Sequence, residues 1–271
     1  MVVALPLVLS ACLASTPTFD ASTDPAPLVV APLTTDPGDT FVYQRDGGNL
    51  TVSAPATNTG GNTRQLYYPS DGPTAEAEQS CQTWSSGSGA IDQQGVALRI
   101  APTADGQGTR AITVNKNIWY VAVWDFWVNL WDSTQQPFPF TQVASFDMSS
   151  VVGADLYTLV PYPWHVCARV SGNILQFIVW TGTNPQPDWG DAGAVRQVTL
   201  PPGWDYPGRA GWYVGHLEAG MTDTFTDMKT WSLKGALDPP TTSTSTTTST
   251  TSTSTSTSTT TSTTSTSVAG P

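Results

Sequence analysis

Apolar stretches of strand length recur along the middle of this chain, and turn residues separate them. We expect strands near residues 40–45, 49–53, 96–101, 110–116, 118–131, 141–148, 156–160, 164–170, 173–180, 195–200, 210–217 and 222–233. No stretch shows helical periodicity over three turns. Glu and Lys are scarce, whereas Gly, Pro, Thr and Trp are frequent, which also favours strands and turns over helices. These patterns predict an all-β fold, a two-sheet antiparallel sandwich.

The segment 118–131 shows which side chains should face a core. Its even positions are all apolar, as a row that faces a core at period two requires. Its odd positions include Asp125, Trp127, Asn129 and Trp131, so aromatic rings alternate with polar groups on the other face. Such a face can stack a ring and hydrogen-bond its edge.

A tight hairpin turn is expected at residues 171–173, where Gly172 is free to take a positive φ. In the strand before this turn, apolar side chains share one side and His165, Cys167 and Arg169 share the other. In the strand after it, Trp180 falls on the side opposite the apolar row. His165, Arg169 and Trp180 are therefore further candidates for ligand contact.

The first twelve residues resemble a bacterial lipoprotein signal. The apolar run over residues 1–9 is too short to span a bilayer, and LSAC at residues 9–12 is similar to a lipobox. The resemblance implies that Cys12 is lipidated and anchors the protein at the bacterial surface. No Lys or Arg precedes the run, so an ordinary secretory signal cleaved near Ala14 is the alternative. Either signal places the protein outside the cytoplasm, anchored in the first case and secreted in the second.

Two low-complexity segments flank the expected domain. Residues 13–38 are rich in Pro, Thr and Asp and are expected to form a disordered linker. The tail contains only Thr and Ser from Thr241 to Ser267 and resembles the O-glycosylated stalks of exported proteins. The predicted organisation is a signal peptide with lipobox over 1–12, a linker over 13–38, a sandwich domain over 39–237 and a Ser/Thr-rich tail over 238–271.

The three cysteines agree with this division. With Cys12 assigned to lipid, Cys81 and Cys167 remain as a pair that an oxidising compartment would join. Their bridge would close a loop worth about 4 kcal/mol in the chain-entropy model. Two free buried thiols are the alternative. The histidines, His165 and His216, stand in no recognised metal-ligand spacing, so no metal site is expected.

Three segments form a recognisable pattern: WHVCARVSGN at 164–173, GWYVGHL at 211–217 and a last strand at 224–228. This pattern resembles concanavalin A-like lectin/glucanase domains, also described as laminin G-like, and the similarity covers roughly residues 39–237. These are turn and core motifs, which specify a fold better than an activity. The resemblance implies a jelly roll of two curved antiparallel sheets, with ligands on the concave face or at the loop rim. Members of this family bind or cleave glycans.

The carboxylates argue against glycosidase activity. Glycosidases need one carboxyl group as acid and a second as nucleophile or base, and in this superfamily the resemblance implies a spaced Glu-x-Asp-x-x-Glu pattern. That pattern is absent, and Glu76, Glu78 and Glu218 are expected to be solvated or turn residues. Asp125 with Asp147 is the alternative acid/base pair for a glycoside hydrolase or lyase. No Gly-x-Ser-x-Gly motif points to a serine hydrolase.

The eleven tryptophans favour a binding function, because one small core cannot hide all of them and a flat indole suits the apolar face of a sugar ring. We expect a non-catalytic, lectin-like surface module that binds a glycan or polysaccharide. The expected ligand contacts are Asp125, Trp127, Asn129, Trp131, His165, Arg169 and Trp180. The second alternative is a structural or adhesive module that binds protein, and a phage-derived module is one form of this alternative.

The net charge of -11 disfavours nucleic acid and anionic lipid as partners, since both would be repelled. The protein is expected to be a monomer without a cofactor, and its only link to the membrane is the lipid. Calcium is an alternative, because Asp188 and Asp191 share a turn-rich loop. Two carboxylates are a thin signal, however, and solvated loop aspartates are the favoured interpretation.

Overall fold

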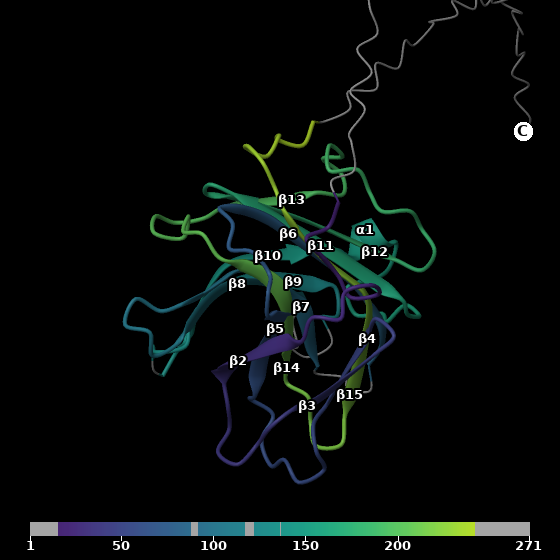
Figure 1. Ribbon diagram of the computed structural model, residues 1–271. Coiled ribbons are helices and arrows are strands. Elements are labelled where there is room, and N and C mark those ends of the chain that lie inside the picture. The colour runs from purple at the N-terminus through teal and green to yellow at the C-terminus, as the bar shows by residue number, and fades with distance from the viewer. Residues whose placement is uncertain (1–15, 88–91, 117–121, 136, 242–271) are drawn as a thin grey trace, which may run out of the picture.

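The computed structural model describes residues 16–87, 92–116, 122–135 and 137–241. Two layers of strands lie face to face, and one short helix, α1 (Ser149–Val152), lies beside them (Figure 1). Each layer is an antiparallel sheet. The expected all-β sandwich is therefore confirmed.

Sheet A runs in the order β13, β12, β11, β6, β15, β4, β3, and the short strand β1 also pairs with β15. Its strands are β1 (Phe19–Asp20), β3 (Val42–Asp46), β4 (Asn49–Ser53), β6 (Ala77–Gly87), β11 (Trp164–Ser171), β12 (Ile174–Thr181), β13 (Arg196–Thr199) and β15 (Thr222–Ser232).

Sheet B runs in the order β10, β9, β8, β7, β14, β5, β2. Its strands are β2 (Leu28–Thr34), β5 (Arg64–Pro69), β7 (Gln93–Pro102), β8 (Thr109–Lys116), β9 (Asp125–Asp132), β10 (Phe140–Asp147) and β14 (Arg209–Gly215).

The main core lies between the two sheets and is rich in aromatic rings. Trp84 and Trp164 of sheet A meet Phe126 of sheet B there. The Trp84 and Phe126 rings are stacked with their centroids 5.9 Å apart, a distance typical of aromatic pairs. The predicted alternation is confirmed, because the even positions of β9 and the apolar row of β11 both face this core. Period-two patterning thus placed the inward faces of these strands correctly.

Two local predictions in sheet A are confirmed. The β11–β12 hairpin turns through Gly172, whose φ is +54°. Cys81 and Cys167 form a disulfide between directly paired residues of β6 and β11. Both features connect the strands that form the middle of this sheet.

Other strand predictions were wrong. Residues 156–160 form a turn followed by irregular chain instead of a strand, and β5 and β6 were missed. Of the strand expected over 118–131, residues 117–121 lie outside the described residues, and β9 begins only at Asp125. The strand β6 was missed because Glu, Gln and Ser interrupt its apolar pattern.

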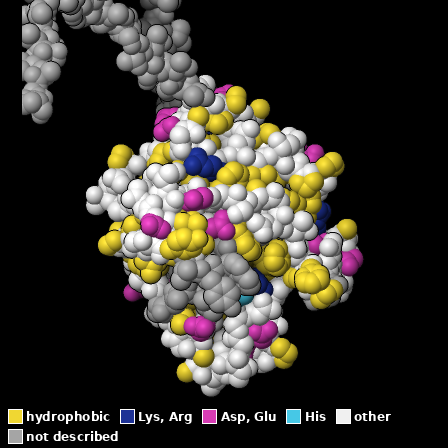
Figure 2. All heavy atoms as spheres, turned by 180° about the vertical axis from the view of Figure 1, so that it is seen from behind, with side chains coloured by type: hydrophobic (Ala, Val, Ile, Leu, Met, Phe, Trp, Pro, Cys, Tyr) yellow, Lys and Arg dark blue, Asp and Glu magenta, His cyan; other side chains and the backbone are white. Residues whose placement is uncertain are grey.

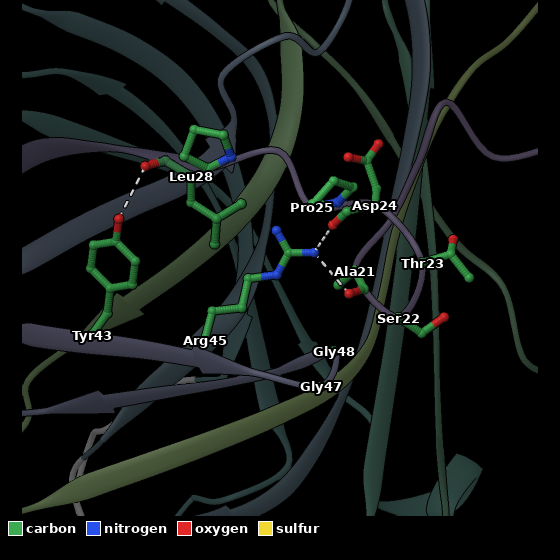
Figure 3. Close-up of a pocket in the computed structure, with 11 residues that line it drawn as sticks. Ala21, Ser22, Thr23, Asp24, Pro25, Leu28, Tyr43, Arg45, Gly47 and Gly48 are labelled. Carbon is green, nitrogen blue, oxygen red and sulfur yellow. Dashed lines mark hydrogen bonds between the residues drawn. The ribbon is translucent and has the colours of Figure 1, made fainter.

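The linker expected over 13–38 is also wrong from residue 16 onward, because this segment contains β1 and β2. Arg45 holds it in place: its guanidinium donates hydrogen bonds to the carbonyls of Ala21, Asp24 and Ala26, as Figure 3 shows for the first two. The same segment and the β3–β4 hairpin line a cavity of about 510 Å³. Arg45 therefore acts as a structural clamp, and the domain begins earlier than residue 39.

Sheet B curls strongly. Cα atoms of β2 and β8 approach within 8 Å although three strands separate them. In a flat sheet that separation would be about 19 Å. A second apolar cluster fills the inside of this curl, away from the main core. The outer face of sheet B is therefore concave.

Cys12, the expected lipidation site, and the Ser/Thr tail beyond Thr241 lie outside the described residues. Within the described ranges, no helix is long and apolar enough to cross a bilayer.

Candidate functional site

The residues expected to contact a ligand do not form one site. Four of them lie on β9 of sheet B, and three lie on β11 and β12 of sheet A. All seven point away from the main core, so the two groups occupy opposite outer faces of the sandwich. Sequence alternation distinguishes the inward from the outward side of a strand, but it does not show which sheet the strand joins.

The sheet B group is largely closed to ligand. Trp131 is only 1% exposed, and its indole Nε1 donates to Thr113 Oγ1 at 2.9 Å. Asn129 is 2% exposed, and its amide nitrogen donates to Asn115 at 3.1 Å. The Trp131 ring lies 6.0 Å from the ring of Tyr213, although two strands, β8 and β7, separate β9 from β14, which carries Tyr213. Trp131 and Asn129 thus belong to the second apolar cluster and its polar border, which contradicts their expected role.

Asp125 and Trp127 remain half-buried at the start of β9. The Trp127 indole donates to Asp125 Oδ2 at 2.8 Å, and Ser145 donates to the other carboxylate oxygen. Asp147 pairs directly with Asp125 across β9 and β10, and it accepts a hydrogen bond from the backbone N–H of Ser149. The alternative acid/base pair is therefore adjacent on the outer face, and both carboxylates already serve as local hydrogen-bond acceptors.

Five of the ten described tryptophans are half-buried, and three of these five gather on the outer face of sheet A. Trp180, Trp189 and Trp231 all pack against a small cluster around the disulfide. The other two, Trp127 and Trp204, lie elsewhere. We call the surface formed by Trp180, Trp189 and Trp231 the tryptophan face.

The register of the strands sets the layout of the tryptophan face. One row crosses four strands through Trp180, His165, Thr83 and Thr226. Two residues further along β11, a second row of outward-facing side chains carries the disulfide. A third row, two residues beyond it, runs from Arg169 through Gln79 to Trp231. From strand spacing and rise per residue, Trp180 and Trp231 are about 20 Å apart. The face is therefore long enough to contact an extended ligand.

Each of two indoles is stacked on a polar partner. The His165 and Trp180 rings are 4.9 Å apart and inclined by only 11°. The Arg169 guanidinium lies 4.2 Å from the centre of the Trp189 ring, and its nitrogens donate to Gln176 Oε1 at 2.6 and 2.9 Å. Burial lowers the pKa of Arg169 below its usual value. These contacts hold the two rings in fixed orientations beside hydrogen-bonding groups.

A chain of hydrogen bonds fixes His165. Its Nδ1 lies 2.8 Å from Thr83 Oγ1, and its Nε2 lies 2.9 Å from the carbonyl oxygen of Gly182. Thr83 Oγ1 in turn donates to Asp227 Oδ2 at 3.1 Å. Asp227 is exposed, so the chain ends at the surface with a carboxylate acceptor.

Sequence reasoning missed Trp231 and Asp227 because of a β-bulge. Between Thr226 and Lys229 the register of β15 shifts, and Asp227 takes a φ of +50°. A bulge of this kind inverts the inward and outward alternation, so Trp231 faces outward although Phe225 faces inward. Trp189 was not among the expected contacts, and its position beside Arg169 has no local signal in the sequence.

Buried ionisable groups lie between the sheets. Glu78, expected in a loop, lies in β6 and is 1% exposed; burial raises its pKa to about 8. Asp223 lies in β15 near Asp92, which forms an ion pair with Lys116 at 3.1 Å. Burial, followed by the charge of Asp92, raises the pKa of Asp223. All four of these side chains are enclosed, so they do not contribute to either outer face.

The loop aspartates considered for calcium cap their own turns. Asp188 Oδ1 accepts from the N–H of Gly190 at 2.6 Å, and Asp191 Oδ1 accepts from Gly193 at 2.8 Å. Within the described ranges, no three His, Cys, Asp or Glu side chains group to hold a metal ion. Figure 2 shows acidic side chains spread over one side of the molecule and no extended basic patch there.

Comparison with known proteins gives likeness in fold only. No family model matches the chain, and no curated protein matches it significantly. A carbohydrate-binding module, CBM66 from Bacillus subtilis, is 10% identical, with 75% of this chain and 95% of that chain covered and a TM-score of 0.42. The exoplasmic/lumenal domain of VIP36, with Ca²⁺ and Man3GlcNAc bound, is 12% identical over 74% and 85%, with a TM-score of 0.43. A β-1,3-1,4-glucanase from a mouse hindgut metagenome is 10% identical over 79% and 97%, with a TM-score of 0.45. These values describe a similar β architecture with little shared sequence.

Proposed function

We propose that this protein is a non-catalytic glycan-binding module and that the tryptophan face of sheet A is its binding surface. The observation that carries the proposal is the gathering of three half-buried indoles, Trp180, Trp189 and Trp231, on one sheet face. Single aromatic side chains at a protein surface are common, but a group of them on one face is typical of a binding site.

The polar groups around the rings support a sugar ligand in particular. His165, Arg169 and Asp227 lie between or beside the indoles and offer donors and an acceptor. Sugars present an apolar ring face and an edge of hydroxyl groups, so they need both kinds of contact within a few ångströms. The stacked pairs supply the apolar contact and also fix the polar groups, which reduces the conformational entropy lost on binding.

The rigidity of the face adds to this argument. The disulfide between Cys81 and Cys167 lies directly under the three indoles. Because β6 and β11 are covalently joined there, the rows that carry Trp180 and Trp231 keep a fixed spacing. A fixed, elongated row of aromatic contacts favours a polysaccharide over a single free sugar.

Binding to a panel of soluble and insoluble polysaccharides tests the proposal, with release of reducing sugar measured on every ligand retained. Alanine variants of Trp180, Trp189 and Trp231 should each lower the affinity about tenfold, since loss of one aromatic contact is worth about 1–1.5 kcal/mol. Retention without sugar release is the expected result.

Trp127→Ala and Trp204→Ala are the matched controls, because both remove a half-buried indole outside the tryptophan face. Both should keep the affinity of the unaltered protein. Loss of binding in these two variants but not in the first three would place the site elsewhere. Retention of no polysaccharide at all, or release of sugar, would overturn the proposal.

We also propose that the module acts outside the cell, held by a lipid on Cys12. The disulfide supports an oxidising compartment, where such bridges form and persist. Metabolic labelling with a radioactive fatty acid should mark the protein in its native host, and Cys12→Ser should remove the label. Label on the Cys12→Ser protein, or no label on the native protein, would contradict the proposal of a lipid anchor at Cys12.

A further inference from the structure

A second cavity, of about 330 Å³, opens at the end of the concave face of sheet B. Residues from opposite edges of the sheet line it, because the curl brings β2 and the segment before β10 together. Thr34, Asn62 and Arg64 form one wall, and Phe138 and Phe140 form the other. We call this cavity the Arg64 pocket.

Arg64 brings a positive charge into this pocket. Among the described residues, no carboxylate oxygen lies within 4.0 Å of its guanidinium, since the ion pairs found there join other residues. Its Nη1 donates to Thr34 Oγ1 at 3.0 Å and to Asn62 Oδ1 at 2.5 Å, and both acceptors are neutral. None of the residues that line this pocket is an Asp or Glu, so the charge of Arg64 has no carboxylate partner in the lining.

His216 positions the guanidinium without competing with it for an anion. Its Nε2 lies 2.5 Å from Arg64 Nη2. Burial, followed by the charge of Arg64, lowers the pKa of His216 to about 3. The ring is therefore neutral near neutral pH and accepts the hydrogen bond from Arg64. The positive charge of Arg64 remains unbalanced.

Aromatic rings complete the pocket. The guanidinium lies 5.7 Å from the ring centre of Trp131 and 5.9 Å from that of Phe140, which fixes its plane. Phe138 is 77% exposed, the most exposed of the large apolar side chains that the structure describes. Its neighbours are Pro137 and Pro139, whose rings restrict the backbone. An exposed ring held opposite a cation can cover the flat face of a bound molecule.

We propose that the Arg64 pocket binds a carboxylate attached to an apolar-faced ring, as in a uronic acid residue of an acidic polysaccharide. Arg64 would pair with the carboxylate. Thr34 and Asn62 would form hydrogen bonds with the hydroxyl groups of the ring, as donors or as acceptors. Phe138 would lie against the ring face. The site lies on the sheet opposite the tryptophan face, so its success or failure is independent of the surface proposed above.

Titration of the full chain with sodium glucuronate, with glucose and with phenylacetate tests this assignment. Glucuronate should bind at least about tenfold more tightly than glucose, since a charge-assisted pair to arginine is the main difference between them. Higher ionic strength should weaken glucuronate binding only. Equal affinity for glucuronate and glucose overturns the role of the carboxylate, and tighter binding of phenylacetate than of glucuronate overturns the sugar class.

Variants locate the binding. Arg64→Gln should reduce glucuronate affinity to that of glucose, and Phe138→Ser should weaken both sugars by a similar factor. Phe138 is exposed, so this second variant keeps the test valid if Arg64→Gln fails to fold. Arg110→Gln is the matched control, because Arg110 also stacks on rings, at 4.4 Å from Trp204, but lies outside the pocket. Undiminished glucuronate binding by both pocket variants, or its loss in the Arg110 control, overturns the proposal.

Discussion

The two outer faces of this sandwich start from similar sequence patterns and end differently. On β9 of sheet B, Trp127, Asn129 and Trp131 alternate with core residues, and on β11 and β12 of sheet A, His165 and Trp180 do the same. Yet Trp131 is buried at 1% exposure, whereas Trp180 is half-buried and faces outward. The pattern of the strands alone does not distinguish the open face from the closed one.

Curvature makes the difference. Sheet B curls until β2 approaches β8, and small residues such as Ala97 and Ala111 let the Trp131 ring lie across the middle of the curl. Sheet A is held by a disulfide between neighbouring strands, and its large side chains stand at the surface around it. The concave outer face of sheet B is filled by its own side chains and becomes a second core. The outer face of sheet A does not fold over itself, so its aromatic rings stay partly exposed.

The largest expected effect tests the support of sheet A. Replacing Cys81 and Cys167 together by Ala should lower the free energy of unfolding by about 4.5 kcal/mol, because the unfolded chain regains the freedom of a long loop. Urea unfolding at neutral pH measures this loss. Adding reductant to the double variant should change nothing further, and a loss under about 1 kcal/mol would contradict the stabilising role.

Trp131→Ala tests whether the outer face of sheet B is a core. Removing a fully buried indole should lower the free energy of unfolding by about 4 kcal/mol, since the surrounding rings cannot close the cavity. Urea unfolding measures this effect, and Trp127→Ala on the same strand, which is half-buried, should cost much less. Under conditions where Trp131→Ala is folded, binding at the tryptophan face should be unchanged. Weakened binding there would mean that the two faces are coupled.

Acid should lower the free energy of unfolding through His216, which lies beside Arg64 at the end of sheet B. Its pKa is about 3 in the folded protein and about 6.5 when unfolded, so the unfolded chain binds the extra proton first as the pH falls. This stabilising contribution is complete above pH 6.5 and is lost between pH 6.5 and 3, with a loss of about 2 kcal/mol at pH 5.

The comparison variant is His216→Asn, because Asn tolerates the left-handed φ of +57° at this position. Buried Glu78 and Asp223 have raised pKa values and act with the opposite sign, since their contributions are lost as the pH rises. The difference between the two proteins therefore isolates His216. Parallel stability profiles from pH 7 to pH 5 would show that His216 does not titrate in this way.

The sequence supported the sandwich, the hairpin at Gly172 and the disulfide because each follows from local alternation, turn chemistry or cysteine count. Prediction from the sequence was wrong where the position of a side chain depends on segments that are distant in the chain. The curl of sheet B depends on β2, which lies in a Pro-rich segment without a clear strand pattern. The outward position of Trp231 depends on a bulge of one strand. Which outer face is open is therefore a property of tertiary structure.

Trp180→Ala has the smallest expected effect on stability and tests the open face directly. Its indole is half-buried and stacked on His165, so its removal should cost about 1 kcal/mol, roughly half the value of fully burying a large apolar side chain. Urea unfolding beside Trp131→Ala, under identical conditions, measures the contrast between the two faces. If the two variants lose equal stability, the tryptophan face is a packed layer like the inside of the sheet B curl. A small loss of stability combined with a large loss of glycan affinity is the result that a binding surface requires, because its rings are held for a ligand and contribute little to the fold.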